Sequence, residues 1–409
     1  MIVTKKVDRS ISRTSVKLAL DIIRHNIIES DEQSNVIREE VAFEIQKDMI
    51  RAGLVMPLTA VTVVDKNEIA NDDELNSIIL KLLSQNEVFQ YRYTEVNNEI
   101  ILKVKEAKKD LVILKLSDVR EQDVQNIIQT TNGVLIKELS KNYLNSKLYF
   151  VYVIQSNSKY CINFVISHII ADAGINTAIN RAIREIITND EYTPPQYKDY
   201  VSRIKQTPRE NGYSLIVKNF ISINKENKNK LELLLEEREL LKESVSVSLK
   251  NWDYVLFESA FVVGKRIINY TGIMKLVMKV SYNFRNAFDE KYQSLIGDCH
   301  SYFFVMMKSG DTLEEFCKRN FEYLDLIRKE KIECGYFRSV EDSVYMEIYD
   351  STKVNINLMT DNYLCEDDVI QYLDSSLALN QKLLNSSIHR IDIALFKKNY
   401  YMYISKGVF

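Results

Sequence analysis

The stretch Ser167-His168-Ile169-Ile170-Ala171-Asp172-Ala173-Gly174 sets a histidine and an aspartate four residues apart between two segments of clear periodicity. The residues before it, Tyr160–Ile166, are mostly β-branched and aromatic, which is typical of a strand. After it, apolar residues recur at helical spacing at Ile175, Ala178, Ile179, Ala182, Ile183 and Ile186. The chain is therefore predicted to pass from a strand through a short loop into a helix, and His168 lies in that loop.

A histidine at a strand end is a candidate general base, because its imidazole can accept a proton near neutral pH. A bare HxxxD pattern has low specificity, since a chance occurrence is expected in roughly one such chain in four. His168 as a core histidine is the alternative, and Asp172 is equally well explained as the N-cap of the following helix. A metal site through His168 and Asp172 lacks further nearby ligands and is not expected.

The N-terminal half around this loop alternates helix and hairpin patterns. Glu74–Gln85 carries apolar residues at helical spacing, and Val88–Tyr93 with Glu99–Val104 reads as strand, turn, strand. Leu148–Ile154 and Tyr160–Ile166 form a second hairpin pattern, separated by a polar turn. We therefore predict a lobe of mixed α and β structure, with His168 in the loop between a strand and a helix.

The C-terminal half follows a similar mixture. Three of the four prolines fall within Asn189–Asn211, which predicts a connector. The predicted organisation is a first lobe over residues 1–190, a connector over 191–215 and a second lobe over 216–409. Lys225–Ser244 reads as one exposed amphipathic helix. Helices are also predicted at Tyr254–Arg266 and Leu313–Lys331, and strands at Lys275–Tyr282, Ser301–Lys308, Lys353–Met359, His389–Lys397 and Tyr400–Ser405.

Composition narrows the function classes. The chain has 409 residues, a net charge of −3, 46% hydrophobic and 27% charged residues, which fits a folded protein and disfavours an electrostatic nucleic-acid binder. No 18-residue apolar run or signal peptide is evident, so a cytoplasmic protein without membrane contact is expected. The five cysteines are scattered without a CxxC pair, which argues against disulfides and zinc. Phosphate-loop glycine motifs are missing, which disfavours nucleotide-binding folds.

With these stretches in place, the sequence resembles the condensation domains of nonribosomal peptide synthetases, within the chloramphenicol acetyltransferase-like acyltransferases. The family signature HHxxxDG reads here with Ser167 for its first His and Ala173 for its Gly, while His168 and Asp172 are kept. Further segments are similar in family order, between about residues 70 and 310: Leu82–Arg92, Asn132–Lys137, Gln196–Tyr200, Ser281–Arg285 and Leu295–Gly297.

The resemblance implies an α/β (α+β) fold of two acetyltransferase-like lobes in a V with a tunnel between them. It also implies a free-standing, monomeric acyltransferase that forms an amide or ester bond. Its donor would be a phosphopantetheine thioester on an acyl or peptidyl carrier protein or on coenzyme A, and its acceptor a small amine or alcohol. No permanently bound cofactor is expected.

The same resemblance assigns roles to individual residues. His168 is the catalytic base, and Asp172 pairs with Arg285 to support the loop that carries it; a surface arginine is the alternative for Arg285. Ser167 would widen the pocket or hydrogen-bond the loop. Gly174 and Asn357 are further candidates for substrate contacts. A catalytically silent module that binds a carrier protein or another partner is the competing hypothesis, because Ser167 and Ala173 depart from the family motif.

Overall fold

The computed structural model divides the chain into two compact units, which we describe separately. The first contains residues 1–201 and the segment Lys291–Cys299, and the second contains residues 202–290 and 300–409. The structure describes residues 2–6, 35–52, 57–107, 113–140, 143–172, 174–189, 191–206, 212–232, 238–244, 252–283, 285, 290–332, 334, 344–359, 391–396 and 399–405.

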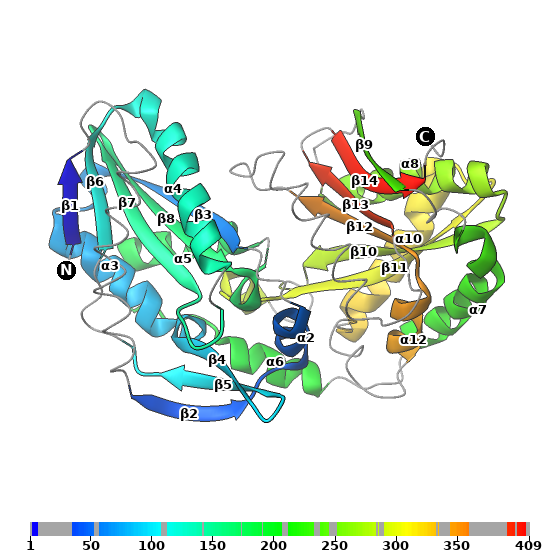
Figure 1. Cartoon of the computed structure of the whole chain (residues 1–409), viewed down its shortest axis with the longest axis horizontal. Coiled ribbons are helices and arrows are strands. Elements are labelled where there is room, and N and C mark those ends of the chain that lie inside the picture. The colour runs from blue at the N-terminus through cyan, green and yellow to red at the C-terminus, as the bar shows by residue number, and fades with distance from the viewer. Residues whose placement is uncertain are drawn as a thin grey trace. The chain divides into compact units, whose positions relative to one another are not determined.

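A five-stranded mixed sheet forms the centre of the first unit (Figure 1). Its order is β1-β6-β7-β8-β3, with β1 at Ile2–Lys6, β6 at Ile113–Val119, β7 at Tyr149–Ser156, β8 at Lys159–Ser167 and β3 at Pro57–Asp65. β7 and β8 form the predicted hairpin, and β3 pairs antiparallel with β8 at the sheet edge. β8 is buried along almost its whole length, which fixes the position at which it ends beside His168.

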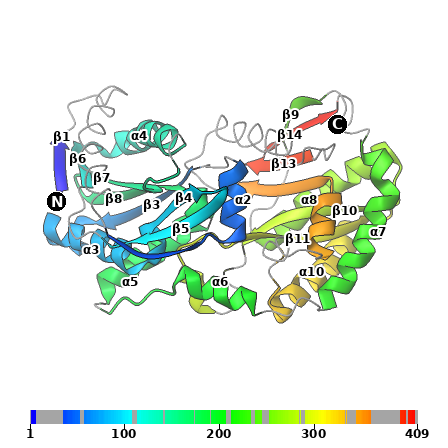
Figure 2. The same cartoon turned by 60° about the horizontal axis from the view of Figure 1, so that its bottom comes forward.

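Helices cover both faces of this sheet. Helix α4, Val124–Leu139, lies on one face, and α3, Asp72–Gln85, lies with α5, Ile175–Thr188, on the other (Figure 2). Tyr152 of β7 donates a hydrogen bond to Asn132 of α4 over 2.7 Å, so this polar pair lies inside the interface. The apolar stripe of α5 is buried at all six positions predicted from the sequence.

A smaller antiparallel sheet completes the first unit. Its order is β2-β5-β4, with β2 at Val36–Val41, β5 at Glu99–Lys105 and β4 at Tyr91–Val96. Helix α2, Glu44–Ala52, follows β2 and contacts the short turn that begins at His168. Helix α6, Tyr197–Lys205, begins in this unit and continues into the second.

The second unit has a six-stranded sheet of order β11-β10-β12-β13-β14-β9. The strands are β11 at His300–Lys308, β10 at Lys275–Asn283, β12 at Val354–Met359, β13 at Ile391–Phe396, β14 at Asn399–Ser405 and β9 at Arg238–Ser244. Helices α7 (Gly212–Glu232), α8 (Trp252–Thr271), α10 (Leu313–Glu330) and α12 (Val344–Ser351) accompany it. Phe257 of α8 packs edge-on against Phe303 of β11 and Phe316 of α10, which joins these helices to the sheet.

The structure confirms the mixed α and β class and most predicted elements, with two corrections. Lys225–Ser244 is not one helix: α7 ends at Glu232, and residues 238–244 form β9, which pairs with β14. Cross-strand pairing in the sheet outweighs the local helical pattern there. Within the predicted connector, Tyr197–Lys205 forms α6, whose Tyr197, Tyr200, Val201 and Ile204 are buried. Among the described residues, no helix is long and apolar enough to cross a membrane.

Polar side chains of α5 bind the free edge of β3. Asn176 accepts a hydrogen bond from the Val61 amide over 3.0 Å, and Asn180 donates to the Val61 carbonyl over 3.0 Å. One turn further, Arg184 donates to the Val63 carbonyl over 2.6 Å. The helix thus supplies partners to a strand edge that would otherwise be open to pairing with another chain. These bonds also fix α5, which begins directly after the HxxxD loop.

We expect Asn176→Ala to lower the free energy of unfolding by about 1–3 kcal/mol, because the Val61 amide loses its acceptor and Asn180 loses a partner. Asn157→Ala is the matched control, since Asn157 is exposed and its side chain makes no hydrogen bond with the described part of the chain. Urea unfolding of both variants measures the difference. Equal stability of the two variants would show that the α5 to β3 bonds contribute nothing.

Candidate active site

His168 is the first residue after β8 and begins a single 3-10 turn, His168–Ile170. The turn is capped by Ser167, whose hydroxyl accepts a hydrogen bond from the Ile169 amide over 3.3 Å. The Ser167 amide donates to the Leu148 carbonyl over 2.7 Å, which anchors the end of β8 to the segment before β7. The histidine is therefore held between a sheet and a capped turn, and Ser167 acts on the loop through its hydrogen bond.

The imidazole of His168 lies deep in the fold but keeps part of its surface accessible. Burial lowers the pKa of His168 below its ordinary value, because the charged form loses hydration; the contact with its own backbone and the charge of Asp172 act in the opposite direction. The net direction is downward, so the ring is neutral at pH 7. A neutral imidazole is the form that can accept a proton.

Asp172 is almost fully buried, at 1% exposure, and both of its carboxylate oxygens accept backbone hydrogen bonds. Oδ1 accepts from the Gly174 amide over 2.7 Å, and Oδ2 accepts from the Cys299 amide over 2.6 Å. The N-cap interpretation of Asp172 is wrong, because the N-cap of α5 is Gly174 and receives no side-chain bond there. Asp172 instead joins the His168 loop to the segment Lys291–Cys299, which comes from far along the chain.

Several segments that carry the family resemblance contact one another in the first unit. Gln196 accepts a hydrogen bond from the Glu87 amide over 3.1 Å and donates to the Gln85 carbonyl over 2.8 Å. Gly297 packs against the ring of Tyr197 so closely that an added Cβ would lie 2.3 Å from a ring carbon. A side chain at position 297 would therefore push this segment off the unit. The contact explains why the stretch Leu295–Gly297 needs a glycine.

The second unit carries two further candidates. Arg285 is buried and Asn357 is half-buried on β12, and both belong to the second unit. The Arg285 to Asp172 pair therefore stays a prediction. His300 begins β11, while His25 and His389 lie outside the described residues. Within the described ranges, no group of three or more His, Cys, Asp or Glu side chains could hold a metal ion.

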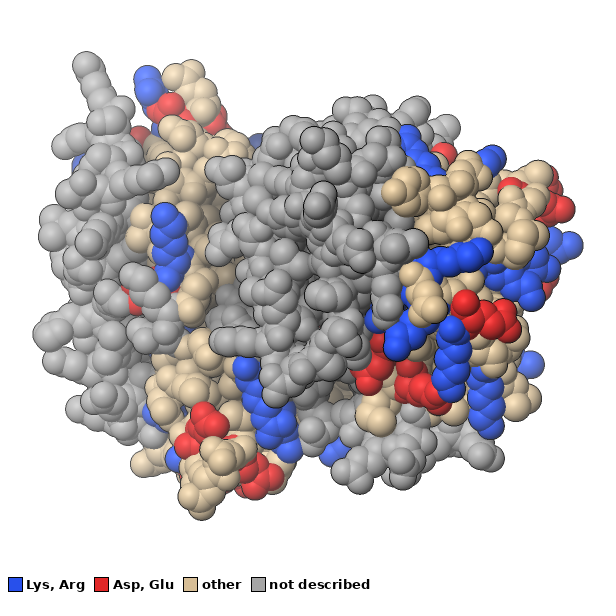
Figure 3. Space-filling model, turned by 45° about the vertical axis from the view of Figure 1, so that its right-hand side comes forward, with Lys and Arg blue, Asp and Glu red and all other residues tan. Residues whose placement is uncertain are grey.

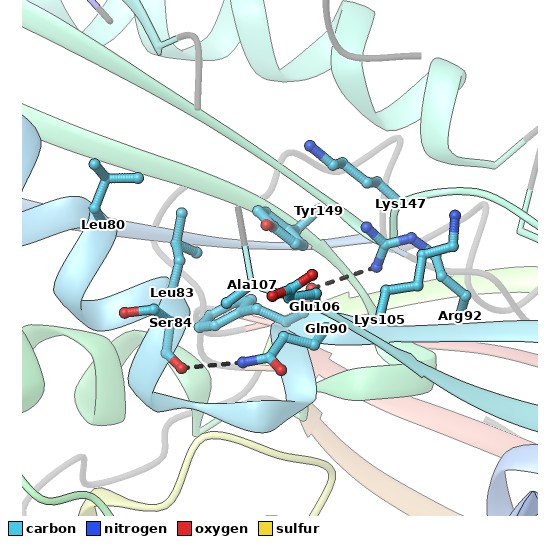
Figure 4. A pocket seen from close by; sticks show the side chains of 11 residues that line it. Leu80, Leu83, Ser84, Gln90, Arg92, Lys105, Glu106, Ala107, Lys147 and Tyr149 are labelled. Atoms are coloured by element: carbon cyan, nitrogen blue, oxygen red, sulfur yellow. Dashed lines mark hydrogen bonds between the residues drawn. The ribbon is translucent and has the colours of Figure 1, made fainter. Parts of the chain in front are cut away.

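The first unit has a pocket lined by residues of α3, β4, β5 and their neighbours (Figure 4). Its lining includes the apolar Leu83 and Phe89 and the basic Arg92, Lys105 and Lys147. The guanidinium of Arg92 donates to the Phe89 carbonyl over 3.3 Å and to the Tyr91 carbonyl over 2.7 Å, so backbone oxygens of its own strand region hold it. His168 and Asp172 do not line this pocket, so we do not assign the chemistry to it.

Sequence patterns did not reveal two partners of the loop. One is the backbone amide of Cys299, and the residue type at that position gives no sign of this contact. The other is Gln46 of α2, which donates from Nε2 to the Ile169 carbonyl over 3.2 Å. The only sequence signal at Gln46 is a polar residue in a short helix, and that is typical of a solvent-facing position. Both contacts depend on residues more than 120 positions apart.

No family model matches the chain, and no curated protein does. Solved structures do. The holo form of T3CT is 12% identical with a TM-score of 0.58, covering 97% of this chain and 91% of that one. The starter condensation domain of rhizomide synthetase RzmA, a double mutant in complex with C8-CoA and Leu-SNAC, is 8% identical with a TM-score of 0.56, covering 90% and 88%. The epimerization domain of the third module of tyrocidine synthetase B is 11% identical with a TM-score of 0.53, covering 90% and 92%. The chain therefore has the fold of the condensation domains that its sequence resembles.

Proposed function

We propose that the protein is a condensation-type acyltransferase that forms an amide or ester bond from a phosphopantetheine thioester. The observation that carries the proposal is His168: a neutral, partly accessible imidazole on a capped turn at the end of a buried strand. The fold supports it, because the starter condensation domain of RzmA, which has a similar fold, is known as a double mutant in complex with C8-CoA and Leu-SNAC. A small amine or alcohol is the acceptor.

The reaction is acyl transfer. The acceptor nitrogen or oxygen attacks the thioester carbonyl carbon, the new C–N or C–O bond forms, and a tetrahedral oxyanion results. His168 takes the proton that the acceptor releases. The C–S bond then breaks, and the proton passes to the departing thiolate, which leaves as a free thiol. A positioned base of this kind contributes on the order of a hundred- to ten-thousand-fold.

Asp172 acts on the loop and not on the reacting atoms in this proposal. Its oxygens hold the amides of Gly174 and Cys299, so the segment after His168 cannot move freely. We also propose that Arg285 pairs with Asp172, because a guanidinium fork suits a carboxylate bidentately. A double-mutant cycle with Asp172→Asn and Arg285→Gln tests the pair: a coupling energy near zero in urea unfolding would exclude it.

We propose a carrier protein as the preferred acyl donor over free coenzyme A. Free coenzyme A carries nucleotide phosphates, which proteins bind with clustered cations or phosphate loops. On the face that Figure 3 presents, Lys and Arg side chains of the described residues lie among Asp and Glu side chains. Lys225 of α7 and Glu347 of α12 also form an ion pair over 2.7 Å. Together with the net charge of −3, this mixture favours a carrier protein.

The expected result is a higher kcat/KM for one acyl group on a carrier protein than for the same group on coenzyme A. Candidate acyl groups are loaded on both donors, a panel of amines and alcohols is offered, and thiol release and product mass are followed. Equal or faster turnover of the acyl-CoA would overturn the carrier preference. Carrier binding without turnover of any thioester would instead support the silent module.

A further inference from the structure

Gln46 occupies a position where a polar side chain is costly. It lies in α2 with 0% exposure, beside the turn that begins at His168. Its Nε2 donates to the carbonyl of Ile169, the residue directly after His168, over 3.2 Å. The neighbouring core position Ile50 of α2 is apolar and 3% exposed, as expected for the inner side of a short helix. Gln46 is a polar exception to this pattern, and its side chain binds the turn of the candidate active site.

The second polar atom of Gln46 makes packing alone a poor explanation. Its Oε1 is buried and has no hydrogen-bond partner among the residues that the structure describes. A buried amide oxygen without a partner costs free energy that an apolar side chain of the same size would avoid. A leucine or methionine would fill this space with no such penalty. The hydrogen bond to the Ile169 carbonyl is the one contact that an apolar side chain could not make.

Two contacts thus fix the His168 turn from opposite ends. Asp172 ties the end of the loop to the Cys299 amide, and Gln46 ties the Ile169 carbonyl to α2. We propose that Gln46 is a positioning residue for His168: its amide fixes the Ile169 peptide and thereby the direction in which the imidazole points. This inference rests on the proposed function, because His168 is the group that it positions.

The variant Gln46→Met tests the proposal, because it keeps the length of the side chain and removes the donor. We expect kcat to fall about tenfold with KM nearly unchanged, since a base displaced by even 1 Å can cost up to about a hundredfold in rate. The midpoint of urea unfolding should stay close to that of the wild type, because an unpartnered oxygen is removed together with the bond. Gln85→Met, at an exposed position of α3, is the matched control.

Gln46→Glu supplies a readout that a packing role would not move. A carboxylate cannot donate to the Ile169 carbonyl, and its negative charge beside the turn raises the pKa of His168 relative to the wild type. Among the described residues, Asp172 is the charged group that acts on the pKa of His168, and it is unchanged in this variant. The acidic limb of the pH–rate profile should move to higher pH in Gln46→Glu and stay in place in Gln85→Met.

Histidine NMR separates this inference from the proposed function, because it needs no substrate. The chain has four histidines, and the resonance missing in His168→Ala assigns His168. A changed His168 shift in Gln46→Met and a raised pKa in Gln46→Glu support positioning even if no acyl transfer is found. Unchanged His168 resonances and pKa in both variants would overturn it. Loss of the folded state in Gln46→Met would also overturn it, by making Gln46 a packing residue.

Discussion

His168→Ala is expected to lower acyl transfer by about two to four orders of magnitude while the protein stays folded, because the proposed base is lost. The turn keeps its anchors, since Ser167, Asp172 and Gln46 bind it through atoms that do not belong to the imidazole. KM for the thioester should change little, because the ring acts on the proton of the acceptor.

The measurement is thiol release under saturating donor and acceptor, together with circular dichroism of both proteins. His389→Ala is the control, because His389 belongs to none of the segments that resemble the family. If the turnover of His168→Ala were within a few-fold of the wild-type value, His168 would not be the catalytic base.

The titration of His168 gives this site two pH dependences. Its lowered pKa means that activity is retained at pH 7 and falls as the pH drops through that value, which lies below about 6.5. Below about pH 6.5 the unfolded chain binds the proton more readily than the folded one, so the folded state loses stability as the pH falls. The wild type should therefore lose stability relative to His168→Ala in acid. If the difference in the free energy of unfolding between the two proteins stayed constant from pH 7 to pH 5, the burial of the His168 ring would be contradicted.

Local patterns were sufficient for the elements that carry the site. The apolar stripe from Ile175 to Ile186 predicts α5, and the β-branched and aromatic run Tyr160–Ile166 predicts β8, because both signals are local to the sequence. The same reasoning failed at residues 238–244, where a charged, leucine-rich sequence pairs with β14 as a strand. A strand at a sheet edge draws its stability from its partner, and that partner is more than 150 residues away in the sequence.

The chemistry of the site was predictable only in part for a related reason. His168 and Asp172 form a recognisable spacing, and the ordered resemblance along the chain gives the fold. The role of Asp172 depends on a backbone amide at Cys299, and a backbone amide is present at almost every residue. Only the folded chain shows which one faces the carboxylate. The N-cap interpretation was the reasonable local alternative, but Gly174 takes the N-cap position of α5, and the Asp172 carboxylate binds the amides of both Gly174 and Cys299.

Asp172→Ala should be the most destabilising substitution in this loop, with a loss of about 3–5 kcal/mol in the free energy of unfolding. The change leaves the Gly174 amide and the buried Cys299 amide without the carboxylate that accepts from both. Hydrogen bonds to a charged acceptor contribute about 1.5–3 kcal/mol each, so two of them account for this range. The segment Lys291–Cys299 loses its tie to the loop at the same time.

Asp172→Asn should lose less, because its single amide oxygen can serve one of the two N–H groups while its NH₂ faces the other. The expected order of stability is wild type, then Asn, then Ala. Asp199→Asn, at an exposed position of α6, is the control and should lie close to the wild type. Hydrogen exchange adds a local readout: the Cys299 amide should be strongly protected in the wild type and exchange faster in both Asp172 variants. If its exchange is unchanged in Asp172→Ala, the carboxylate does not hold this segment, and the loop must be fixed from the α2 side alone.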